Sequence, residues 1–329
     1  MESKFNNLGQ TDLKVSKIGL GGWAFGSDWG EQPVDQSIET IVAAVESGCR
    51  FIDTAAGYGK GRSEQVIAKA LSRLTAADSV AVATKIHPVM PGPWPPSPYC
   101  KIEDRYPVEH LEKLLDTSLK NLRTDAIDLV QLHTWTRAWN KNPVALEWLS
   151  EQKRKGKVKW VGVSTPEHDQ NSVIDLMRRG LVDSVQLIYN LFEQEPAAEL
   201  LPVANELGIG VIVRVALDEG SLVGKWTEDH SFASGDFRNQ YFGGDRLQRT
   251  ITRTKRVEKL LKDSGYSLRE AALKFVLDHE AVDTVVVGAR NKKQAEMNMR
   301  VMELPTMDSV LLERLREFNW PKGFWYSGK

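Results

Sequence analysis

The 329-residue sequence has only two cysteines, and its charged side chains nearly cancel, with a formal net charge of −1. Two cysteines are too few for a disulfide framework, and a nearly neutral chain has no general attraction for nucleic acid or an anionic membrane. No apolar run approaches the roughly 20 residues that a membrane-spanning helix needs, and the polar segment Met1–Gln10 lacks the apolar core of a signal peptide. These absences favour a cytoplasmic globular protein that binds neither nucleic acid nor membrane.

What the sequence contains is a regular alternation of short β-prone apolar runs and longer amphipathic stretches. Strands alternating with helices imply parallel strands joined by right-handed crossovers. The expected strands are Ser16–Leu20, Arg50–Asp53, Ser79–Lys85, Ala126–His133, Val158–Ser164, Ser184–Ile188, Gly210–Val215 and Asp283–Gly288. The expected helices, from apolar residues at helical spacing, are a segment around Ile38–Val45, then His110–Leu122, Val144–Lys155, Asn171–Arg179, Ala197–Leu207, Ser267–His279 and Lys292–Val301.

Two architectures fit this alternation: a closed eight-stranded barrel and an open, doubly wound sheet. The glycines of Gly19–Gly26 lack the spacing of the dinucleotide fingerprint that opens a doubly wound nucleotide-binding unit. We therefore predict an α/β fold, a (β/α)8 TIM barrel, as one domain over residues 1–329. The segment Phe5–Val15 carries a turn signal at Leu8–Thr11, which predicts an N-terminal β-hairpin closing one end of the barrel.

Two irregular segments predict long loops. His87–Tyr106 is rich in proline, and Leu217–Arg249 mixes aromatic, glycine and charged residues. Loops of this length in a compact protein are usually functional. Each follows a predicted strand, so we expect both at the C-terminal face of the barrel, where barrel enzymes place their active sites.

Polar side chains stand at the ends of three consecutive predicted strands. Asp53 ends the second strand, Lys85 the third and His133 the fourth, and Tyr58 follows five residues after Asp53. Taken singly, Asp53 has an alternative as a helix cap, Lys85 as a solvated charge and His133 as a structural histidine. Neighbouring strand ends converge in a barrel, so together these residues predict a common site.

The four residue types suit reduction of a carbonyl group. Hydride addition to a carbonyl creates an alkoxide that needs a proton donor, and a tyrosine has an ordinary pKa near 10. A neighbouring ammonium lowers the pKa of a phenol, and a carboxylate holds that ammonium in place. A histidine orients the substrate oxygen and shares in proton transfer.

In chain order, Asp53, Tyr58, Lys85 and His133 resemble the Asp-Tyr-Lys-His tetrad of the aldo-keto reductases. The stretch Phe51–Gly59 is similar to the family's signature around its tyrosine, Ser63-Glu64 also fits, and the resemblance extends from about Phe5 to about Val301. It implies that Tyr58 is the general acid and base, that Lys85 tunes Tyr58, that Asp53 positions Lys85, and that His133 orients the substrate carbonyl.

The resemblance also implies a nicotinamide dinucleotide cofactor. Ser164 and Gln186 match the residues that bind the nicotinamide carboxamide, although the next position, commonly Asn in relatives, is Thr165 here. Arg214 stands where relatives commonly carry a tyrosine that stacks on nicotinamide, and a planar guanidinium also stacks. The further cofactor residues implied are Gly22, Trp23, Asp53, Leu217, Gly220, Ser221, Leu222, Lys225, Gly288, Arg290, Gln294 and Asn298.

The segment after the last predicted strand bears on the choice of nucleotide. A glycine-containing turn that enters a helix N-terminus is a natural anion site, and Arg290 offers a planar fork to a phosphate. The basic residues favour NADP(H) over NAD(H).

We expect a small carbonyl or alcohol substrate, with its pocket formed by Trp23, Trp29, Tyr58, His133 and Trp135; loop tryptophans that merely pack on the barrel are the alternative. The histidines show no metal-binding spacing. Two other functions remain open: a barrel lyase in which Lys85 forms a Schiff base, and a regulatory cofactor-binding barrel subunit. The sequence leaves the substrate identity, the reaction direction and the oligomeric state undecided.

Overall fold

The computed structural model describes residues 3–27, 30–93 and 96–320. Eight parallel strands form a closed barrel in the order β10-β3-β4-β5-β6-β7-β8-β9. Their bounds are β3 Ile18–Gly21, β4 Phe51–Asp53, β5 Ala81–Ile86, β6 Ile127–Leu132, β7 Val158–Ser164, β8 Ser184–Ile188, β9 Gly210–Arg214 and β10 Thr284–Gly288. The predicted (β/α)8 barrel is confirmed, and each strand overlaps its predicted run.

The first two strands, β1 (Phe5–Asn7) and β2 (Lys14–Ser16), form the predicted antiparallel hairpin. Its apolar side chains Leu8, Leu13 and Val15 pack into a cluster with residues of the barrel strands, including Phe51 and Leu129. The backbone N–H of Gln10 donates to the carbonyl of Gly208, just before β9, at 2.9 Å. The hairpin therefore closes the end of the barrel opposite the carboxyl ends of the strands.

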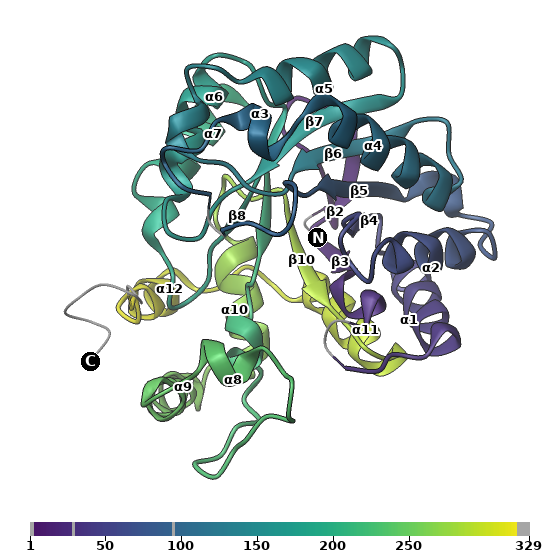
Figure 1. Ribbon diagram of the computed structural model, residues 1–329. Helices are drawn as coiled ribbons and strands as arrows, with labels where there is room; N and C mark the ends of the chain where they lie inside the picture. The colour runs from purple at the N-terminus through teal and green to yellow at the C-terminus, as the bar shows by residue number, and fades with distance from the viewer. Residues whose placement is uncertain (1–2, 28–29, 94–95, 321–329) are drawn as a thin grey trace.

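Helices cover the outside of the barrel (Figure 1). They bury one face against the strands, as their apolar spacing predicts. Their bounds are α1 Val34–Glu46, α2 Arg62–Leu71, α3 Ile102–Arg105, α4 Val108–Leu122, α5 Val144–Arg154, α6 Ile174–Arg178, α7 Leu200–Leu207, α8 Arg238–Tyr241, α9 Arg246–Leu261, α10 Leu268–Leu277, α11 Lys292–Met299 and α12 Ser309–Arg316. Within the part of the chain that the structure describes, no helix is long and apolar enough to cross a membrane.

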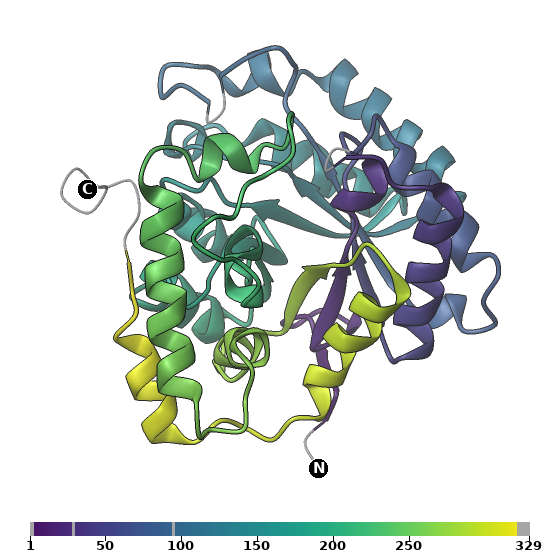
Figure 2. The ribbon, with the colours of Figure 1, turned by 90° about the horizontal axis from the view of Figure 1, so that it is seen from below.

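The two segments expected as loops follow β5 and β9 and so lie at the carboxyl ends of the strands. The first contains the short helix α3 near its end. The second is shorter than predicted, because α9, the long helix at the edge of the molecule in Figure 2, already begins at Arg246. It also contains the 3-10 segment η6 (Asp218–Val223) and the short helix α8.

Candidate active site

A buried ion pair lies at the carboxyl ends of β4 and β5. The ammonium of Lys85 donates to the Asp53 carboxylate at 2.5 Å and to the carbonyl oxygen of Thr54 at 2.8 Å. Lys85 is 1% exposed and Asp53 is 4% exposed. Two charges are stable at such depth only when they are paired and hydrogen-bonded. The structure thus brings two of the predicted residues together with fixed geometry.

The second oxygen of Asp53 accepts hydrogen bonds from two buried amides. Gln186 Nε2 donates to Asp53 Oδ1 at 2.8 Å, and Gln131 Nε2 donates to the same oxygen at 3.3 Å. Gln131 was not among the predicted site residues, although the sequence carries one signal for it. Gln131 lies in β6 two residues before His133, which directly follows the strand, so strand alternation predicts both on one face. These amides hold the Asp53 carboxylate in one orientation toward Lys85.

Tyr58 lies on the loop after β4, and the ammonium of Lys85 lies over the face of its ring. Its ring centroid is 5.2 Å from the ammonium of Lys85 and 5.7 Å from the ring centroid of His133, which follows β6. Burial raises the pKa of Tyr58, whereas the positive charges of Lys85 and Arg214 act to lower it. The net direction is upward, so the sequence-based expectation that Lys85 lowers the pKa of Tyr58 describes one contribution, which burial outweighs. Tyr58 therefore keeps its proton at neutral pH.

His133 completes the predicted tetrad. Burial of its imidazole, together with the positive charges of Lys85 and Arg214, lowers the pKa of His133 well below its usual range. The imidazole is therefore neutral at physiological pH, and a neutral ring both donates and accepts hydrogen bonds. A neutral His133 can therefore donate a hydrogen bond to a polar oxygen of a bound molecule.

The ends of β7 and β8 present polar side chains beside the ion pair. Ser164 Oγ donates to Gln186 Oε1 at 3.5 Å, and Gln186 in turn reaches Asp53. Thr165 turns away, since its hydroxyl donates to Gln170 at 3.1 Å. The two predicted amide-binding residues are thus adjacent, and the threonine that replaces the family's common asparagine is occupied elsewhere.

Arg214 ends β9 and reaches toward the tetrad. Its Nη2 donates to the carbonyl of Thr165 at 3.1 Å, its Nη1 lies 3.6 Å from a Glu167 oxygen, and its Nε is buried without a partner among the described residues. Burial, reinforced by Asp218, raises the pKa of nearby Glu219 to about 7, while Arg214 opposes the shift. Arg214 is thus a cation beside Tyr58 and His133 with one donor still available.

The loop predicted to cover a pyrophosphate forms η6 and its flanks. Ser221 is buried and donates to Asp218 at 2.6 Å, and Gly220 has the positive φ of 99° that favours glycine. Leu222 is buried in the core, Leu217 is half-buried and Lys225 is exposed. Lys225 is the cation of this loop that faces solvent, whereas Ser221 and Leu222 fix the loop on the barrel.

The segment after β10 forms a tight network at the start of α11. Arg290 Nε donates to Gln32 Oε1 at 3.0 Å, and Gln32 Nε2 returns a bond to the Arg290 carbonyl at 2.8 Å. The backbone N–H of Arg290 donates to Gln294. Asn298 is buried, where its Nδ2 donates to Gly288 at 3.2 Å and its oxygen accepts from Arg269. Asn298 therefore supports the turn from its buried side, whereas Arg290 and Gln294 lie on its outer side.

Trp23 and Phe237 narrow the space over Tyr58. The Trp23 ring stacks at 6.0 Å from the Tyr58 ring and lies 5.3 Å from the Phe237 ring, centroid to centroid. Gly22, which precedes Trp23, packs so closely on the Asp53 carbonyl and the Ser63 hydroxyl that a Cβ would approach both to 2.9 Å. The expected tryptophan is thus at the mouth, and Phe237 is an aromatic partner from the long loop after β9 that the sequence analysis did not single out.

The expectation for Trp135 requires a correction. Its side chain is 0% exposed, packs edge-on against Trp139 at 5.4 Å and donates to Asn140 at 2.7 Å. It therefore packs the loop onto the barrel, which was the alternative considered for the loop tryptophans. Trp29, also expected in the pocket, lies outside the described residues.

The predicted cofactor residues follow neighbouring strands. Ser164, Arg214 and Gly288 end β7, β9 and β10, and Gln186 lies within β8; these four strands are consecutive in the barrel, and Gly22 follows β3 next to β10. Asp53, Lys85 and His133 occupy the remaining part of the rim. Amide, hydroxyl and guanidinium groups are thus carried by neighbouring strands on one part of the barrel.

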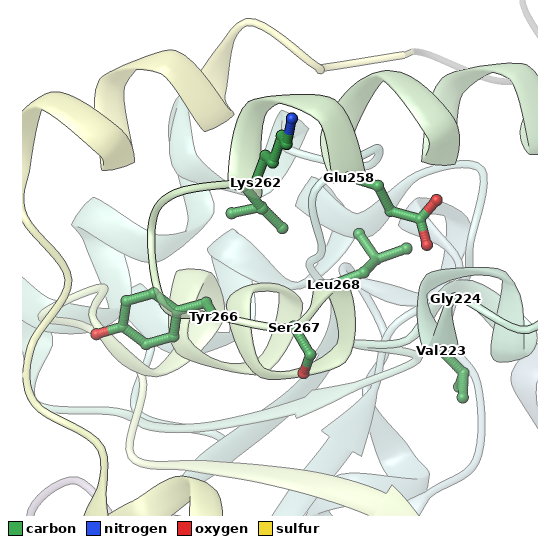
Figure 3. Close-up of a pocket in the computed structure, with 8 residues that line it drawn as sticks. Val223, Gly224, Glu258, Lys262, Tyr266, Ser267 and Leu268 are labelled. Carbon is green, nitrogen blue, oxygen red and sulfur yellow. The ribbon is translucent and has the colours of Figure 1, made fainter.

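A hollow of about 340 Å³ lies away from the tetrad, between the end of η6, α9 and the start of α10. Figure 3 shows that the Glu258 carboxylate and the Lys262 ammonium point in different directions. The Tyr266 hydroxyl donates to the Pro305 carbonyl at 3.2 Å. Because the polar groups do not converge, we place no function there. Among the described residues, no group of three or more His, Cys, Asp or Glu side chains is arranged to hold a metal ion.

Comparison with known proteins identifies the family and similar folds. Residues 17–319 match the family model described as "Aldo/keto reductase family". The chain is 32% identical to the aldo-keto reductase YhdN of Bacillus subtilis, covering 89% of this chain and 87% of that protein. It is 27% identical to the NADH-specific methylglyoxal reductase of Escherichia coli, covering 94% and 97%. The glycerol dehydrogenase AKR11B4 from Gluconobacter oxydans has a similar structure, with a TM-score of 0.78, 26% identity and coverage of 97% and 95%.

Proposed function

The chain belongs to the aldo/keto reductase family, and we propose that it is an NADP(H)-dependent oxidoreductase that interconverts a small carbonyl compound and its alcohol. The observation that carries the proposal is the buried Lys85–Asp53 pair with Tyr58 above it and His133 beside it. This arrangement places a protonated phenol, a fixed cation and a neutral imidazole around one point. We propose Asp53, Tyr58, Lys85 and His133 as the catalytic residues.

Each of these residues has a distinct task in the proposed reaction. Bound NADPH supplies the hydride that the carbonyl carbon accepts. Tyr58 holds the proton that the carbonyl oxygen needs, because burial raises the pKa of its phenol. Lys85 stabilises the phenolate left behind, and Asp53 keeps the Lys85 ammonium in position. His133 donates a hydrogen bond that orients the substrate oxygen. In alcohol oxidation the same groups act in reverse.

The cofactor is proposed to lie along the ends of β7, β8, β9, β10 and β3. Ser164 and Gln186 would bind the carboxamide, Arg214 would lie against the nicotinamide, and the loop from Leu217 to Lys225 would cover the pyrophosphate. Gly288, Arg290 and Gln294 would bind the adenosine phosphate, with Asn298 supporting that turn. The guanidinium of Arg290 favours NADP(H), because its planar fork of N–H donors can bind two oxygens of a 2′-phosphate.

A titration of the purified protein with NADPH and with NADH, followed by tryptophan fluorescence, tests the nucleotide preference. We expect NADPH to bind at least about tenfold more tightly, which is the value of one charge-assisted contact. Equal affinities would remove the NADP(H) preference and keep the oxidoreductase. Binding of neither nucleotide would contradict the proposal and favour the Schiff-base lyase, whereas nucleotide binding without turnover of any carbonyl would favour the regulatory subunit.

A further inference from the structure

Arg105 ends α3, at the end of the loop that follows β5, and its side chain is almost completely enclosed. The residue is 6% exposed. Its carbonyl accepts a hydrogen bond from the Val89 N–H at 2.8 Å, so the backbone at Arg105 is fixed to the start of the same loop. The next residue, Tyr106, directs its hydroxyl at the carbonyl of Thr134, 3.4 Å away and adjacent to His133. The backbone at Arg105 and Tyr106 is therefore held at the end of the barrel where Thr134 and His133 follow β6.

The guanidinium of Arg105 has no counter-charge. Its Nε and Nη2 are buried and make no hydrogen bond, and no carboxylate among residues 3–27, 30–93 and 96–320 forms an ion pair with it. Arg137, at the same end of the barrel, has both hydrogen-bond partners and a counter-charge, because Asp169 accepts two hydrogen bonds from it at 2.6 and 2.7 Å. Arg105 is thus a cation that the fold has enclosed without neutralising.

Enclosure of an unpaired guanidinium is costly, because an ion removed from water loses its solvation. Arginine cannot escape this cost by losing its proton, since a guanidinium stays protonated in proteins. The cost is offset when an anion arrives and accepts the free N–H groups. Arginine binds planar and tetrahedral oxyanions in this way, often through two parallel hydrogen bonds.

A glycine makes space for the Arg105 guanidinium, because it has no side chain at the point of contact. Gly92 lies against Arg105, and a Cβ at position 92 would overlap Nη1. The same loop begins at His87, whose ring would touch a Cβ on Gly57, next to Tyr58, at 3.2 Å. The loop that carries Gly92 therefore extends from the immediate neighbourhood of Tyr58 to Arg105.

We propose that Arg105 is the recognition residue for an oxyanion, a carboxylate or phosphate group, bound in the loop after β5. The oxyanion is either part of the carbonyl substrate, which rests on the function proposed above, or a free anion that binds independently. In the first form the enzyme prefers substrates that carry a negative charge away from the carbonyl. Arg105 then fixes the remote end of the substrate, while Tyr58 and His133 act on its carbonyl.

The first test compares succinic semialdehyde, which carries a carboxylate, with butanal, which does not. In the wild-type enzyme we expect kcat/KM to favour the charged aldehyde by about tenfold to a hundredfold, the value of one charged hydrogen-bonding group. Arg105→Met retains the apolar stem and should abolish this preference, mainly through KM, while butanal turnover stays unchanged. Arg137→Met is the matched control, since it removes one positive charge from the same end of the barrel and should retain the preference.

The second test uses inorganic phosphate and needs no turnover. Phosphate should raise the melting temperature of the wild type and of Arg137→Met, but not of Arg105→Met. Competition with succinic semialdehyde would identify the substrate's own oxyanion as the ligand; stabilisation without competition would identify a free anion. Gly92→Ala, which displaces the guanidinium and leaves it in the chain, should behave like Arg105→Met.

Two results overturn the proposal: a wild type with neither aldehyde preference nor phosphate stabilisation, or variants at positions 105 and 92 that retain both effects. Failure of the proposed oxidoreductase function is distinguishable, because it would abolish reduction of both aldehydes and leave the phosphate measurement intact.

Discussion

The protonation state of Tyr58 follows from its surroundings. Burial raises the pKa of its phenol more than Lys85 and Arg214 lower it. The residue is therefore suited to give a proton to an alkoxide, and it needs Lys85 close by to stabilise the anion that it becomes.

Replacement of Tyr58 by Phe removes the proton donor and leaves the ring in place. We expect kcat for carbonyl reduction to fall by about 10²–10⁴-fold, the usual contribution of general acid catalysis. The dissociation constant of NADPH, measured by fluorescence titration, should change little. Undiminished turnover by the Phe variant would exclude Tyr58 from proton transfer.

Arg214 would bring a positive charge to the nicotinamide in the proposed cofactor site. A cation against the nicotinamide disfavours the positively charged oxidised ring more than the neutral reduced ring. In Arg214→Tyr we expect the ratio of the NADP⁺ and NADPH dissociation constants to fall by about tenfold, as for the loss of one charge interaction. Titration of both redox forms measures the ratio. A ratio equal to that of the wild type would show that Glu167, 3.6 Å from the guanidinium, already neutralises it.

Among single residues, the sequence predicted the positions at strand ends well and the loop side chains poorly. Asp53, Lys85 and His133 converge because a parallel barrel brings consecutive strand ends together, whatever the loops do. Trp135 and Phe237 lie in loops, where no periodicity indicates which way a side chain points. Only the packing against Trp139 and Trp23 decides their orientation.

At the level of elements, the regular strands were predictable because their apolar runs are continuous, as befits strands buried on both faces. Helices α2 and α9 were missed. The buried face of α2 includes Ser63 and Glu64, and Glu64 accepts from Thr84 at 2.7 Å. The buried face of α9 includes Thr250 and Thr254. Apolar residues at helical spacing accompany these polar residues, Val66, Ile67 and Ala70 in α2 and Ile251, Val257 and Leu261 in α9, so the helical period was present in both segments.

Helix α10 begins with a reciprocal cap. The Ser267 side chain accepts from the Glu270 N–H, and the Glu270 carboxylate accepts from the Ser267 N–H at 2.9 Å. Replacement of Ser267 by Ala should lower the free energy of unfolding by about 1 kcal/mol, as measured by urea denaturation. The matched control is Ser72→Ala, an exposed serine that bonds only the Lys69 carbonyl and should change stability by a few tenths of that. Equal effects of the two substitutions would contradict a capping role.

For the molecule as a whole, Asp283, which directly precedes β10, links that part of the chain to the hairpin and to β9. Its carboxylate accepts from the Gly9 N–H at 3.0 Å in the hairpin and from the Val211 N–H at 2.9 Å in β9, and its carbonyl accepts from the Asn6 side chain. Burial raises the pKa of Asp283 to about 6 despite these bonds. Folding therefore favours the protonated carboxyl, so its contribution to stability is complete at low pH and is lost as the pH rises through about 6.

The substitution Asp283→Asn removes the ionisable group and should remove this dependence. Between pH 4 and pH 7 we expect the wild type to lose on the order of 1–2 kcal/mol of unfolding free energy relative to the variant, after allowing for partial exposure. Urea denaturation at the two pH values measures the difference. A constant difference between wild type and variant across this range would contradict the assignment.

The pairing that closes the barrel joins two segments that are far apart in the sequence, because Val286 of β10 lies opposite Gly19 of β3. While a ribosome makes the protein, β3 therefore emerges long before the strand that pairs with its free edge. An exposed edge of a parallel sheet is a template for unwanted pairing. A chain in which β10 has not yet been made therefore has an open sheet that is exposed to such pairing, and the contact between β10 and β3 removes this exposed edge.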